Sequence, residues 1–218
     1  MTLRLDEVQV HHKGEQLFAP VNVSIGAGEI TTIMGPSGCG KSTLLGAVAG
    51  NLVHGFKIVG DIFLNGRRLN DMPMEKRRVG ILFQDDLLFP HLDVFGNLAF
   101  GLPQGLSRTE REEIIVHNLK RAGLEEFIRR DVATLSGGQK ARVSLLRTLL
   151  AKPEAVLFDE PFSKLDKPLR ASFREFVHEQ IAFLAIPALL VTHDFEDSCG
   201  GAVIELRQNP QLAGDMNA

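Results

Sequence analysis

The sequence has few cysteines, no tyrosine or tryptophan, and no excess of basic side chains. Only Cys39 and Cys199 occur among 218 residues, which is too few for a disulfide framework and suits a reducing compartment. The formal net charge of -3 at pH 7 gives no reason to expect nucleic acid as a partner, because such binding usually shows as a basic excess. Disulfide-rich and nucleic-acid-binding classes are therefore set aside.

Long hydrophobic runs are also lacking. The longest apolar stretch, residues 181–191, contains Pro187 and is well short of the roughly 20 residues that span a bilayer. Residues 1–6 carry charge where a signal peptide would need an apolar run. With 44% hydrophobic and 23% charged residues, the composition is that of an ordinary globular protein. We therefore expect a soluble protein in which any work at a membrane goes through a partner.

Four short apolar runs each stop abruptly at a glycine or a polar residue. They are residues 29–34 before Gly35, 79–83 before Gln84, 155–158 before Asp159, and 187–192 before His193. Short apolar runs that alternate with helical patterns are typical of buried parallel strands with helices on the faces. Ligands of such α/β sheets bind beyond the carboxyl ends of the strands, so these four strand ends can meet in one site.

The first of these strand ends carries a phosphate-binding loop. It has a glycine, four further residues, a glycine, a lysine and a serine: Gly35, Pro36, Ser37, Gly38, Cys39, Gly40, Lys41 and Ser42, followed by Thr43. A predicted strand precedes the loop and an apolar helix follows it, which is the context that the motif requires. Backbone N–H groups would face the β-phosphate of a nucleotide, and the helix N-terminus would add its partial positive charge. We expect Lys41 to reach the β- and γ-phosphates and the Ser42 hydroxyl to ligate Mg²⁺.

Cys39 within this loop has two interpretations. A thiol near a helix N-terminus and a lysine can be activated as a nucleophile. The simpler interpretation is a small residue that fits the loop, and we prefer it. A catalytic activity that is intact after treatment with a thiol reagent would argue against the reactive interpretation.

A pair of carboxylates follows the third apolar run. Asp159, at the end of the strand, would hold Mg²⁺ directly or through water, and Glu160 would orient and deprotonate the attacking water. Taken alone, an acidic pair after a strand usually marks the start of a helix. The phosphate loop in the same sequence makes the catalytic interpretation the better one.

A second glycine-containing element stands directly before an amphipathic helix. It consists of Leu135, Ser136, Gly137, Gly138 and Gln139. The two glycines leave bare N–H groups at the helix start and Ser136 adds a hydroxyl, so the element is predicted to bind an anion. The simplest reason for a second anion site in so small a domain is that it binds the γ-phosphate of ATP held by another subunit.

Found together in this order, these motifs resemble the ATP-binding cassette (ABC) family over nearly the whole chain. The likeness is to importer-type transporter ATPases, most of all the short group called YnjD-like. It implies an α/β P-loop NTPase (RecA-like) core with a mainly parallel sheet, an N-terminal antiparallel β portion and a small helical subdomain. The chain would be a single ABC ATPase domain, residues 1–218. Residues 1–86 and 135–218 would form the nucleotide-binding core with the β portion, and about 87–134 the helical subdomain.

The same resemblance implies a head-to-tail dimer of two copies of this chain, with ATP and Mg²⁺ as cofactors. Two ATP molecules would lie at the interface, each on one copy's phosphate loop and facing residues 136–139 of the other. Asp166 looks like part of the family's D-loop, which contacts the opposing subunit. In the family, Gln84 would contact Mg²⁺ and the attacking water, and His193 would contact the γ-phosphate. The predicted catalytic residues are thus Lys41, Gln84, Glu160 and His193, and the predicted metal ligands are Ser42, Gln84 and Asp159.

The segment after Gln84, residues 85–100, is rich in apolar and aromatic residues. It resembles the segment that, in importer ATPases, forms a groove for the coupling helix of a permease. Some of its apolar residues would then be exposed to receive the partner, and the candidates are Leu88, Phe89, Pro90, Val94 and Phe95. The implied partner is an integral membrane permease, with or without an extracytoplasmic solute-binding protein, and no nucleic acid. The implied location is the cytoplasm, on the inner face of the cell membrane.

Other ATPases of the same superfamily fit the sequence less well. No sustained heptad lies between Gln84 and Leu135, where a chromosome-maintenance ATPase would need a long coiled coil. A translation factor would carry two sets of motifs, and only one is present. Residues 107–130 are predicted to be helical instead, with a capping box at Ser107 and Glu110. The remaining alternative is the ATPase of a lipoprotein-type or cell-division exporter, and the segment at residues 88–91 favours import.

The chain departs from the family at the residue that would hold the adenine base. The family usually stacks the base on an aromatic residue near the N-terminus, and the best-aligned residue here is His12. The alternative is that His11 and His12 form a solvated pair on a turn before Gly14. An imidazole buries less area on a purine than a tyrosine does, so the His12 interpretation predicts equal affinity for ATP and GTP in a direct binding assay. A strong preference for ATP would count against it.

Overall fold

The computed structural model describes residues 1–207, which divide into two compact units. The first unit comprises residues 1–81, residues 154–160 and the chain from His178 onwards. The second comprises residues 82–153 and 161–177. The predicted helical subdomain, about residues 87–134, falls inside the second unit, and its exact limits stay a prediction.

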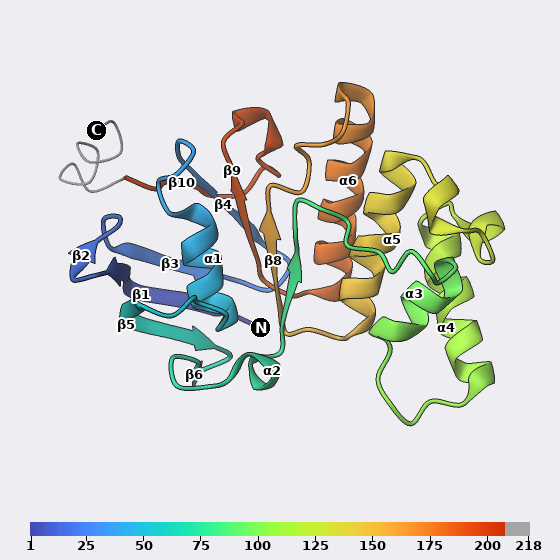
Figure 1. Cartoon of the computed structure of the whole chain (residues 1–218), viewed down its shortest axis with the longest axis horizontal. Coiled ribbons are helices and arrows are strands. Elements are labelled where there is room, and N and C mark those ends of the chain that lie inside the picture. Colours follow the sequence, from blue (N-terminus) through green and yellow to red (C-terminus); the bar gives the residue numbers. More distant parts are fainter. Residues whose placement is uncertain (208–218) are drawn as a thin grey trace. The chain divides into compact units, whose positions relative to one another are not determined.

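An antiparallel sheet forms the N-terminal part of the first unit (Figure 1). Its strands are β1 (Leu3–His12), β2 (Glu15–Gln16), β3 (Val21–Ile25), β5 (Phe56–Leu64) and β6 (Arg67–Arg68). Their order is β2-β1-β5-β6, and β3 also pairs with β1. Leu3, Leu5, Val8 and Val10 of β1 are buried, because a register shift between Leu5 and Val8 returns the later residues to the core face. The antiparallel β portion that the resemblance implies is thus present.

A parallel sheet carries the strand ends predicted from the sequence. Its strands are β4 (Ile30–Met34), β7 (Val79–Leu82), β8 (Ala155–Asp159), β9 (Ala188–Thr192) and β10 (Val203–Glu205), in the order β10-β4-β9-β8-β7. The pairs β10–β4, β4–β9 and β9–β8 are parallel. All four predicted strands are confirmed, and parallel pairing brings the carboxyl ends of β4, β9 and β8 to one edge of the sheet.

Helix α1 (Lys41–Ala49) packs between the two sheets of the first unit. It contacts β1 of the antiparallel sheet and both β8 and β9 of the parallel sheet (Figure 1). Leu44, Leu45 and Val48, the predicted apolar residues of this helix, are at most 3% exposed. They belong to a core that also contains side chains from both sheets. The first unit also contains the short helix α2 (Met74–Arg77) and the 3-10 turn η3 (Phe195–Asp197).

The second unit is mainly helical. It contains α3 (Val94–Gly101), α4 (Arg108–Arg121), α5 (Gly137–Leu150), the first part of α6 (Lys167–Leu184), and the 3-10 turns η1 (Glu125–Phe127) and η2 (Val132–Thr134). Helix α3 packs against both α4 and α5. The predicted capping box of α4 is confirmed, since Ser107 and Glu110 each accept the other's backbone N–H. The predicted end at Arg130 is wrong: α4 stops at Arg121, before Gly123 with a φ of 65°.

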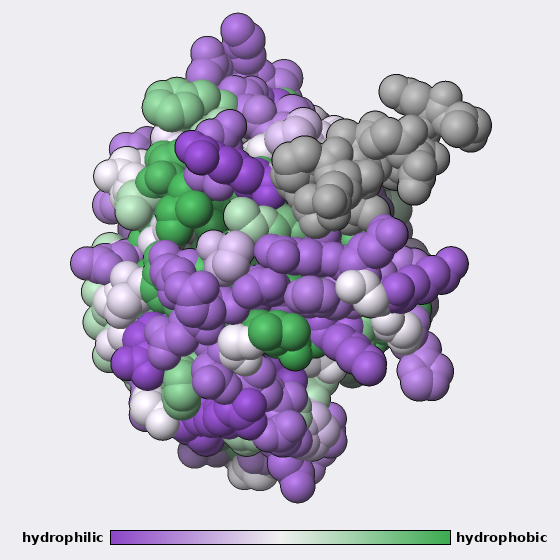
Figure 2. Space-filling model, turned by 90° about the vertical axis from the view of Figure 1, so that its left-hand side faces the viewer, coloured by the Kyte–Doolittle hydropathy of each residue, from purple (hydrophilic) through white to green (hydrophobic). Residues whose placement is uncertain are grey.

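No helix within residues 1–207 is long and apolar enough to cross a membrane. Figure 2 shows one face of the molecule, on which hydrophilic residues predominate and hydrophobic residues lie in small separate groups. The most exposed large hydrophobic side chains of the described chain are Val53, Phe100, Phe183 and Phe195. They come from different parts of the chain: Phe100 lies in α3, Phe183 in α6 and Phe195 in η3.

Asn97 is a fully buried amide that organises the loop before α3. Its Oδ1 accepts the Phe89 N–H at 2.8 Å. Its Nδ2 donates to the carbonyls of Phe89, Leu92 and Asp93 at 3.1, 3.2 and 3.1 Å. One side chain therefore bonds four backbone groups of the segment that leads into α3.

Replacing this amide should destabilise the second unit. Asn97→Leu keeps a similar volume but leaves buried backbone groups without partners, so we expect the free energy of unfolding to fall by about 2–3 kcal/mol. Urea unfolding followed by circular dichroism measures the change. Asn118→Leu is the matched control, because the Asn118 amide donates to Ile114 within its own helix. A loss for Asn97→Leu no larger than that of the control would contradict the role of Asn97.

Candidate active site

The phosphate loop, residues 35–40, connects the end of β4 to the start of α1. Gly40 occupies the N-cap position of α1 with a φ of 100°, a conformation that residues with a side chain rarely adopt. A Cβ on Gly40 would also lie 2.7 Å from Cδ1 of the buried Phe18. Both restrictions require glycine, and they fix the loop directly before the N-terminus of α1, where backbone N–H groups lack partners.

Lys41 is the first residue of α1 and is only 5% exposed. Its Nζ donates to the carbonyl oxygens of Gly35 at 2.7 Å and Pro36 at 2.9 Å. The ammonium group therefore lies across the phosphate loop. A lysine ammonium carries three N–H donors, so this position leaves it able to donate to a further acceptor beside the loop.

Ser42, the next residue of α1, contacts the end of β8. Its Oγ donates to Oδ1 of Asp159 at 3.0 Å, which joins the phosphate loop to the strand-end carboxylate. Burial raises the pKa of Asp159 above its ordinary value; the Ser42 hydrogen bond opposes this shift and the nearby Glu160 adds to it. A hydroxyl and a half-buried carboxylate in contact are oxygen ligands of the kind that hard cations prefer.

Glu160 follows β8 in a left-handed backbone conformation, with a φ of 47°. Such a conformation costs a non-glycine residue roughly 1–2 kcal/mol and is often found at functional sites. The Glu160 N–H donates to the Val191 carbonyl of β9 at 3.0 Å. On the side chain, Oε1 lies 3.1 Å from Nδ1 of His193, which follows β9 and is 53% exposed. The carboxylate of Glu160 is thus oriented by a neighbour and remains reachable from solvent.

In the second unit, the predicted signature residues form the N-terminus of α5. The Oγ of Ser136 accepts the Gln139 N–H at 3.3 Å, and Oε1 of Gln139 accepts the Ser136 N–H at 2.8 Å. This capping box was not predicted, and it gives Gln139 a structural role. The Ser136 hydroxyl proton and the N–H groups of Gly137 and Gly138 can still serve an anion. Ser136 and Gly137 are exposed, whereas Gly138 is buried.

The other predicted site residues of the second unit lie in loops. Gln84 follows β7 and is exposed. Asp166 is also exposed and caps α6, because its Oδ1 accepts the Leu169 N–H at 3.0 Å. Asp85, next to Gln84, forms an ion pair with Lys164, close to Asp166. This pair ties the two loops together, and sequence reasoning missed it because its partners are far apart in the chain.

His12 is the last residue of β1 and stacks on Phe56 of β5. The ring centroids are 4.5 Å apart and the rings are inclined by 20°. The two residues are direct partners across the strands, and both are partly buried. One face of the imidazole is therefore covered, and a base would have to stack on the other. Sequence reasoning missed Phe56 because only the register of β1 and β5 reveals the pair. The adenine role of His12 stays a prediction.

The structure brings five of the predicted site residues together in the first unit: Lys41, Ser42, Asp159, Glu160 and His193. No group of three or more His, Cys, Asp or Glu that could hold a metal ion occurs within residues 1–207. The site combines a glycine-rich loop at a helix N-terminus with a hydroxyl bonded to a strand-end carboxylate, on a parallel α/β sheet. This combination defines a P-loop NTPase.

Comparison with known proteins narrows this class. Residues 18–163 match the family described as ABC transporter. The chain is 45% identical over 209 residues to the uncharacterized ABC transporter ATP-binding protein YnjD of Escherichia coli. The match covers 95% of this chain and 93% of that protein. The chain therefore belongs to the ABC transporter family, in which it is an ATP-binding subunit and an ATPase. The resemblance inferred from the motifs is confirmed.

Two further proteins show how far the likeness extends. The chain is 41% identical over 195 residues to the Fe(3+) ions import ATP-binding protein FbpC of Streptomyces avermitilis, covering 89% of this chain and 56% of that protein. Among solved structures, cbiO1 from Clostridium perfringens, part of the ABC transporter complex cbiONQ, matches with a TM-score of 0.83 and 28% identity. That match covers 94% of this chain and 84% of cbiO1, and it confirms the predicted P-loop NTPase fold.

The buried position of Cys39 decides between the two interpretations of this thiol. Cys39 is 1% exposed, and a Cβ on Gly35 would lie 2.7 Å from its Sγ. Cys199 is less buried, and neither cysteine is in a disulfide. The structure favours Cys39 as a small residue that fills the loop, since reactive cysteines need partial exposure.

We therefore expect N-ethylmaleimide to modify Cys199 and to leave Cys39 unmodified in the folded protein. Peptide mass spectrometry measures both positions, and a urea-unfolded sample shows that each thiol reacts once it is exposed. ATPase activity should survive the treatment of the folded protein. An adduct on Cys39 that forms in the folded state, with loss of activity, would contradict this prediction.

Proposed function

We propose that two copies of this chain hydrolyse ATP at a shared head-to-tail interface and so drive the import of a solute through a separate membrane permease. The observation that carries the proposal is that each chain has two different helix N-termini suited to anions. One is the phosphate loop before α1 in the first unit, and the other is the start of α5 at Ser136 in the second. One bound ATP needs one phosphate loop, so the second element is best explained by an ATP held on the other copy.

In each copy, ATP is held by residues 35–43, which are the phosphate loop and the first turn of α1. Main-chain N–H groups face the β-phosphate, and Lys41 donates to the β- and γ-phosphate oxygens. The position of the ammonium over the loop, bonded to the carbonyls of Gly35 and Pro36, supports this assignment. His12 supports the adenine with the ring face that Phe56 does not cover.

Ser42, Asp159 and Gln84 are the proposed ligands of Mg²⁺. They offer hydroxyl, carboxylate and amide oxygens, which suits a hard cation, and the Ser42 and Asp159 oxygens are in contact at 3.0 Å. When bound, Mg²⁺ would neutralise charge on the β- and γ-phosphates. Burial raises the pKa of Asp159, so its charged form stands to gain from a neighbouring cation.

Glu160 is the proposed general base. Its carboxylate accepts a proton from water while the water oxygen attacks the γ-phosphorus, and the bond from that phosphorus to the bridging oxygen of ADP breaks. The left-handed backbone of Glu160 sets the direction of its side chain at the end of β8. His193, 3.1 Å from Oε1 of Glu160, orients this carboxylate and contacts the γ-phosphate.

Four residues of the second unit serve the ATP of the other copy. Ser136, Gly137 and Gly138 face its γ-phosphate, with Gln139 closing the capping box that orders them. Asp166, at the start of α6, contacts the opposing copy. The γ-phosphate thus joins the two chains, and its release on hydrolysis removes the joint. The loss of one phosphate is a common way in which a chemical step produces a conformational change.

Import is supported by the 41% identity to a protein whose own name states iron import. The proposed contact surface for the permease is the segment after Gln84. Leu87 is 56% exposed, and Phe100 of α3 is 69% exposed and stacks edge-on with Phe89 at 4.7 Å. Val94, one of the residues offered for this surface by the sequence, is fully buried and is not part of it.

Helix α5 supports the segment after Gln84 through hydrogen bonds to its backbone. The Oγ of Ser144 donates to the Asp86 carbonyl at 2.7 Å, and the Arg147 guanidinium donates to the carbonyls of Leu87 at 2.9 Å and Asp86 at 3.3 Å. The N-terminus of the same helix carries Ser136. A permease that moves the loop would therefore move the helix that binds the other copy's ATP.

The proposed permease would place the chain in the cytoplasm on the inner face of the cell membrane, and an extracytoplasmic solute-binding protein would complete an importer. We assign the chain to a single ABC ATPase domain. Residues 1–86 and 135–218 form its nucleotide-binding core with the β portion, and about 87–134 its helical subdomain. The helices α3 and α4, which both lie in that last range, support the division.

The dimer can be tested on the chain alone with Glu160→Gln, which should bind ATP but lose at least about 100-fold in hydrolysis. Light scattering coupled to gel filtration should give the mass of one chain, 24.0 kDa, without nucleotide and twice that mass with ATP. Adding Ser136→Arg to this variant should keep it monomeric, because a large cation fills the place of the γ-phosphate.

Ser107→Arg is the matched control, because Ser107 is also the N-cap of a capping box, at the start of α4. The control should dimerise like Glu160→Gln alone. A Glu160→Gln chain that binds ATP and stays monomeric would contradict dimerisation by ATP alone. Full ATPase activity of that variant would contradict the assignment of the base.

A further inference from the structure

Two cationic side chains are buried within residues 1–207: Lys41 at 5% and Arg77 at 3% exposure. They lie at opposite ends of α1, since Lys41 begins the helix and Arg77 contacts its last turn. Lys41 belongs to the proposed ATP site. Arg77 is outside that site and comes from a different element, the end of α2, which raises the question of what it does there.

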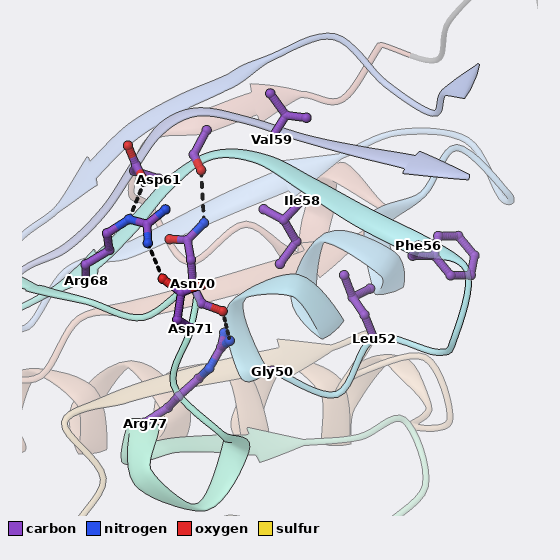
Figure 3. Close-up of a pocket in the computed structure, with 11 residues that line it drawn as sticks. Gly50, Leu52, Phe56, Ile58, Val59, Asp61, Arg68, Asn70, Asp71 and Arg77 are labelled. Atoms are coloured by element: carbon purple, nitrogen blue, oxygen red, sulfur yellow. Dashed lines mark hydrogen bonds and ion pairs between the residues drawn. The ribbon is translucent and has the colours of Figure 1, made fainter. Parts of the chain in front are cut away.

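The Arg77 guanidinium binds four backbone carbonyls, and Figure 3 shows the bond to that of Asn70. Its Nη1 donates to Ala47 at 2.7 Å and Val48 at 2.9 Å, both in the last turn of α1. Its Nε donates to Met72 at 2.8 Å and its Nη2 to Asn70 at 3.2 Å. The side chain therefore bonds the end of the phosphate-binding helix to the loop that leads into α2.

Helix α1 depends on Arg77 for its C-terminal cation. It has no basic residue in its own last turn. The last carbonyls of a helix lack intrahelical partners and carry the negative end of the helix dipole, so a cation is favourable there. Arg77 supplies both the donors and the charge. Burial lowers the pKa of Arg77 and Asp71 opposes that shift. Because a guanidinium stays charged in proteins, Arg77 places a positive charge against four carbonyl dipoles.

Gly50, directly after α1, keeps the space that the guanidinium occupies. Its φ of 85° forms the C-cap, and its N–H donates to Gly46 at 2.9 Å. A Cβ on Gly50 would lie 2.5 Å from Nε and 2.7 Å from Cζ of Arg77. Any side chain at this position must displace the guanidinium, so Gly50 and Arg77 form one structural device.

Asn70 continues the connection into the antiparallel sheet. Its Oδ1 accepts the Ile62 N–H at 2.9 Å, and its Nδ2 donates to the Gly60 carbonyl at 2.9 Å, both in β5. Figure 3 shows the resulting path from β5 through Asn70 to Arg77. Hydrogen bonds thus link a strand of the antiparallel sheet to the far end of the helix that begins at the phosphate loop.

We propose that Arg77 is a positioning residue for ATP hydrolysis: it holds α1 along its axis so that the phosphate loop meets the β- and γ-phosphates. This rests on the proposed place of ATP at residues 35–43. Apolar packing is non-directional and permits a helix to slide, whereas hydrogen bonds at its end fix its distance from the neighbouring loop. With nine residues, α1 is roughly 13 Å long, so a shift at its end reaches its start. A shift of well under ~1 Å already weakens N–H bonds to phosphate oxygens.

Two independent variants test this inference. Arg77→Lys keeps the charge but loses the planar fork, and Gly50→Ala keeps the guanidinium but displaces it. ATP binding is measured by calorimetry at 10 °C in EDTA, which prevents hydrolysis, and AMP binding by ligand-observed NMR. Both variants should weaken ATP binding by about 10-fold, the size of one lost hydrogen bond to a charged group. AMP binding should stay within about twofold of wild type, because AMP lacks the β- and γ-phosphates.

Arg68→Lys is the matched control. Arg68 is an exposed arginine that lines the pocket of Figure 3 together with Arg77, pairs with Asp61 and Asp71, and makes no bond to α1. It should bind ATP like wild type. Variants of Arg77 and Gly50 that melt at lower temperature but bind ATP with wild-type affinity would overturn the inference, since the device would then be structural only. A parallel loss of ATP and AMP would also overturn it. If wild type binds no ATP, the proposed function itself fails.

Discussion

Helix α1 begins at a loop suited to phosphates, and the surrounding structure restricts where that loop can lie. A helix of nine residues is marginal by itself in water, so its existence depends on tertiary packing. Strands β1, β8 and β9 cover its sides, the chain turns into it at Gly40, and Arg77 binds its end. The antiparallel sheet therefore does more than add stability, because its strand β1 packs against the helix that begins at this loop.

The edge of the parallel sheet gathers chemistry from strands that are neighbours in space and distant in sequence. Strands β8 and β9 are adjacent, so Glu160 and His193 emerge side by side, and Ser42 reaches Asp159 from the helix that follows β4. The two carboxylates differ in their surroundings. Burial raises the pKa of Asp159, whereas Glu160 is held by a left-handed backbone and a histidine. Asp159 is therefore suited to bind a cation, whereas the carboxylate of Glu160 is held in one orientation. Hydrolysis of ATP requires a group of each kind.

The elements that the sequence predicts correctly are those that a short stretch of residues determines by itself. Apolar runs that stop at reactive residues located β4, β7, β8 and β9. Glycine-containing motifs next to apolar helical patterns located the phosphate loop and the start of α5. The length of α4 was overestimated, because the charged residues after Arg121 continue a helical composition although Gly123 ends the helix.

Contacts between distant segments could not be predicted in the same way. The stack of His12 on Phe56 depends on strand register, and the bonds of Arg77 to α1 involve backbone carbonyls, which leave no trace in a side-chain pattern. Val94 was offered as an exposed residue because an apolar side chain in a loop and one in a core read alike in sequence. The motif residues themselves were recognisable, while the residues that support them were not.

The capping box at the start of α5 has a consequence for the energetics of pairing. Ser136 and Gln139 already satisfy each other's backbone N–H, so the helix end that would face a neighbouring copy is ordered before any ligand arrives. Little conformational entropy would then be lost there on association, and the surface is preorganised. The affinity between copies would accordingly follow the nucleotide that occupies the interface, with little contribution from folding of the interface itself. In such a chain, the presence or absence of a single phosphate would decide whether two copies are associated or separate.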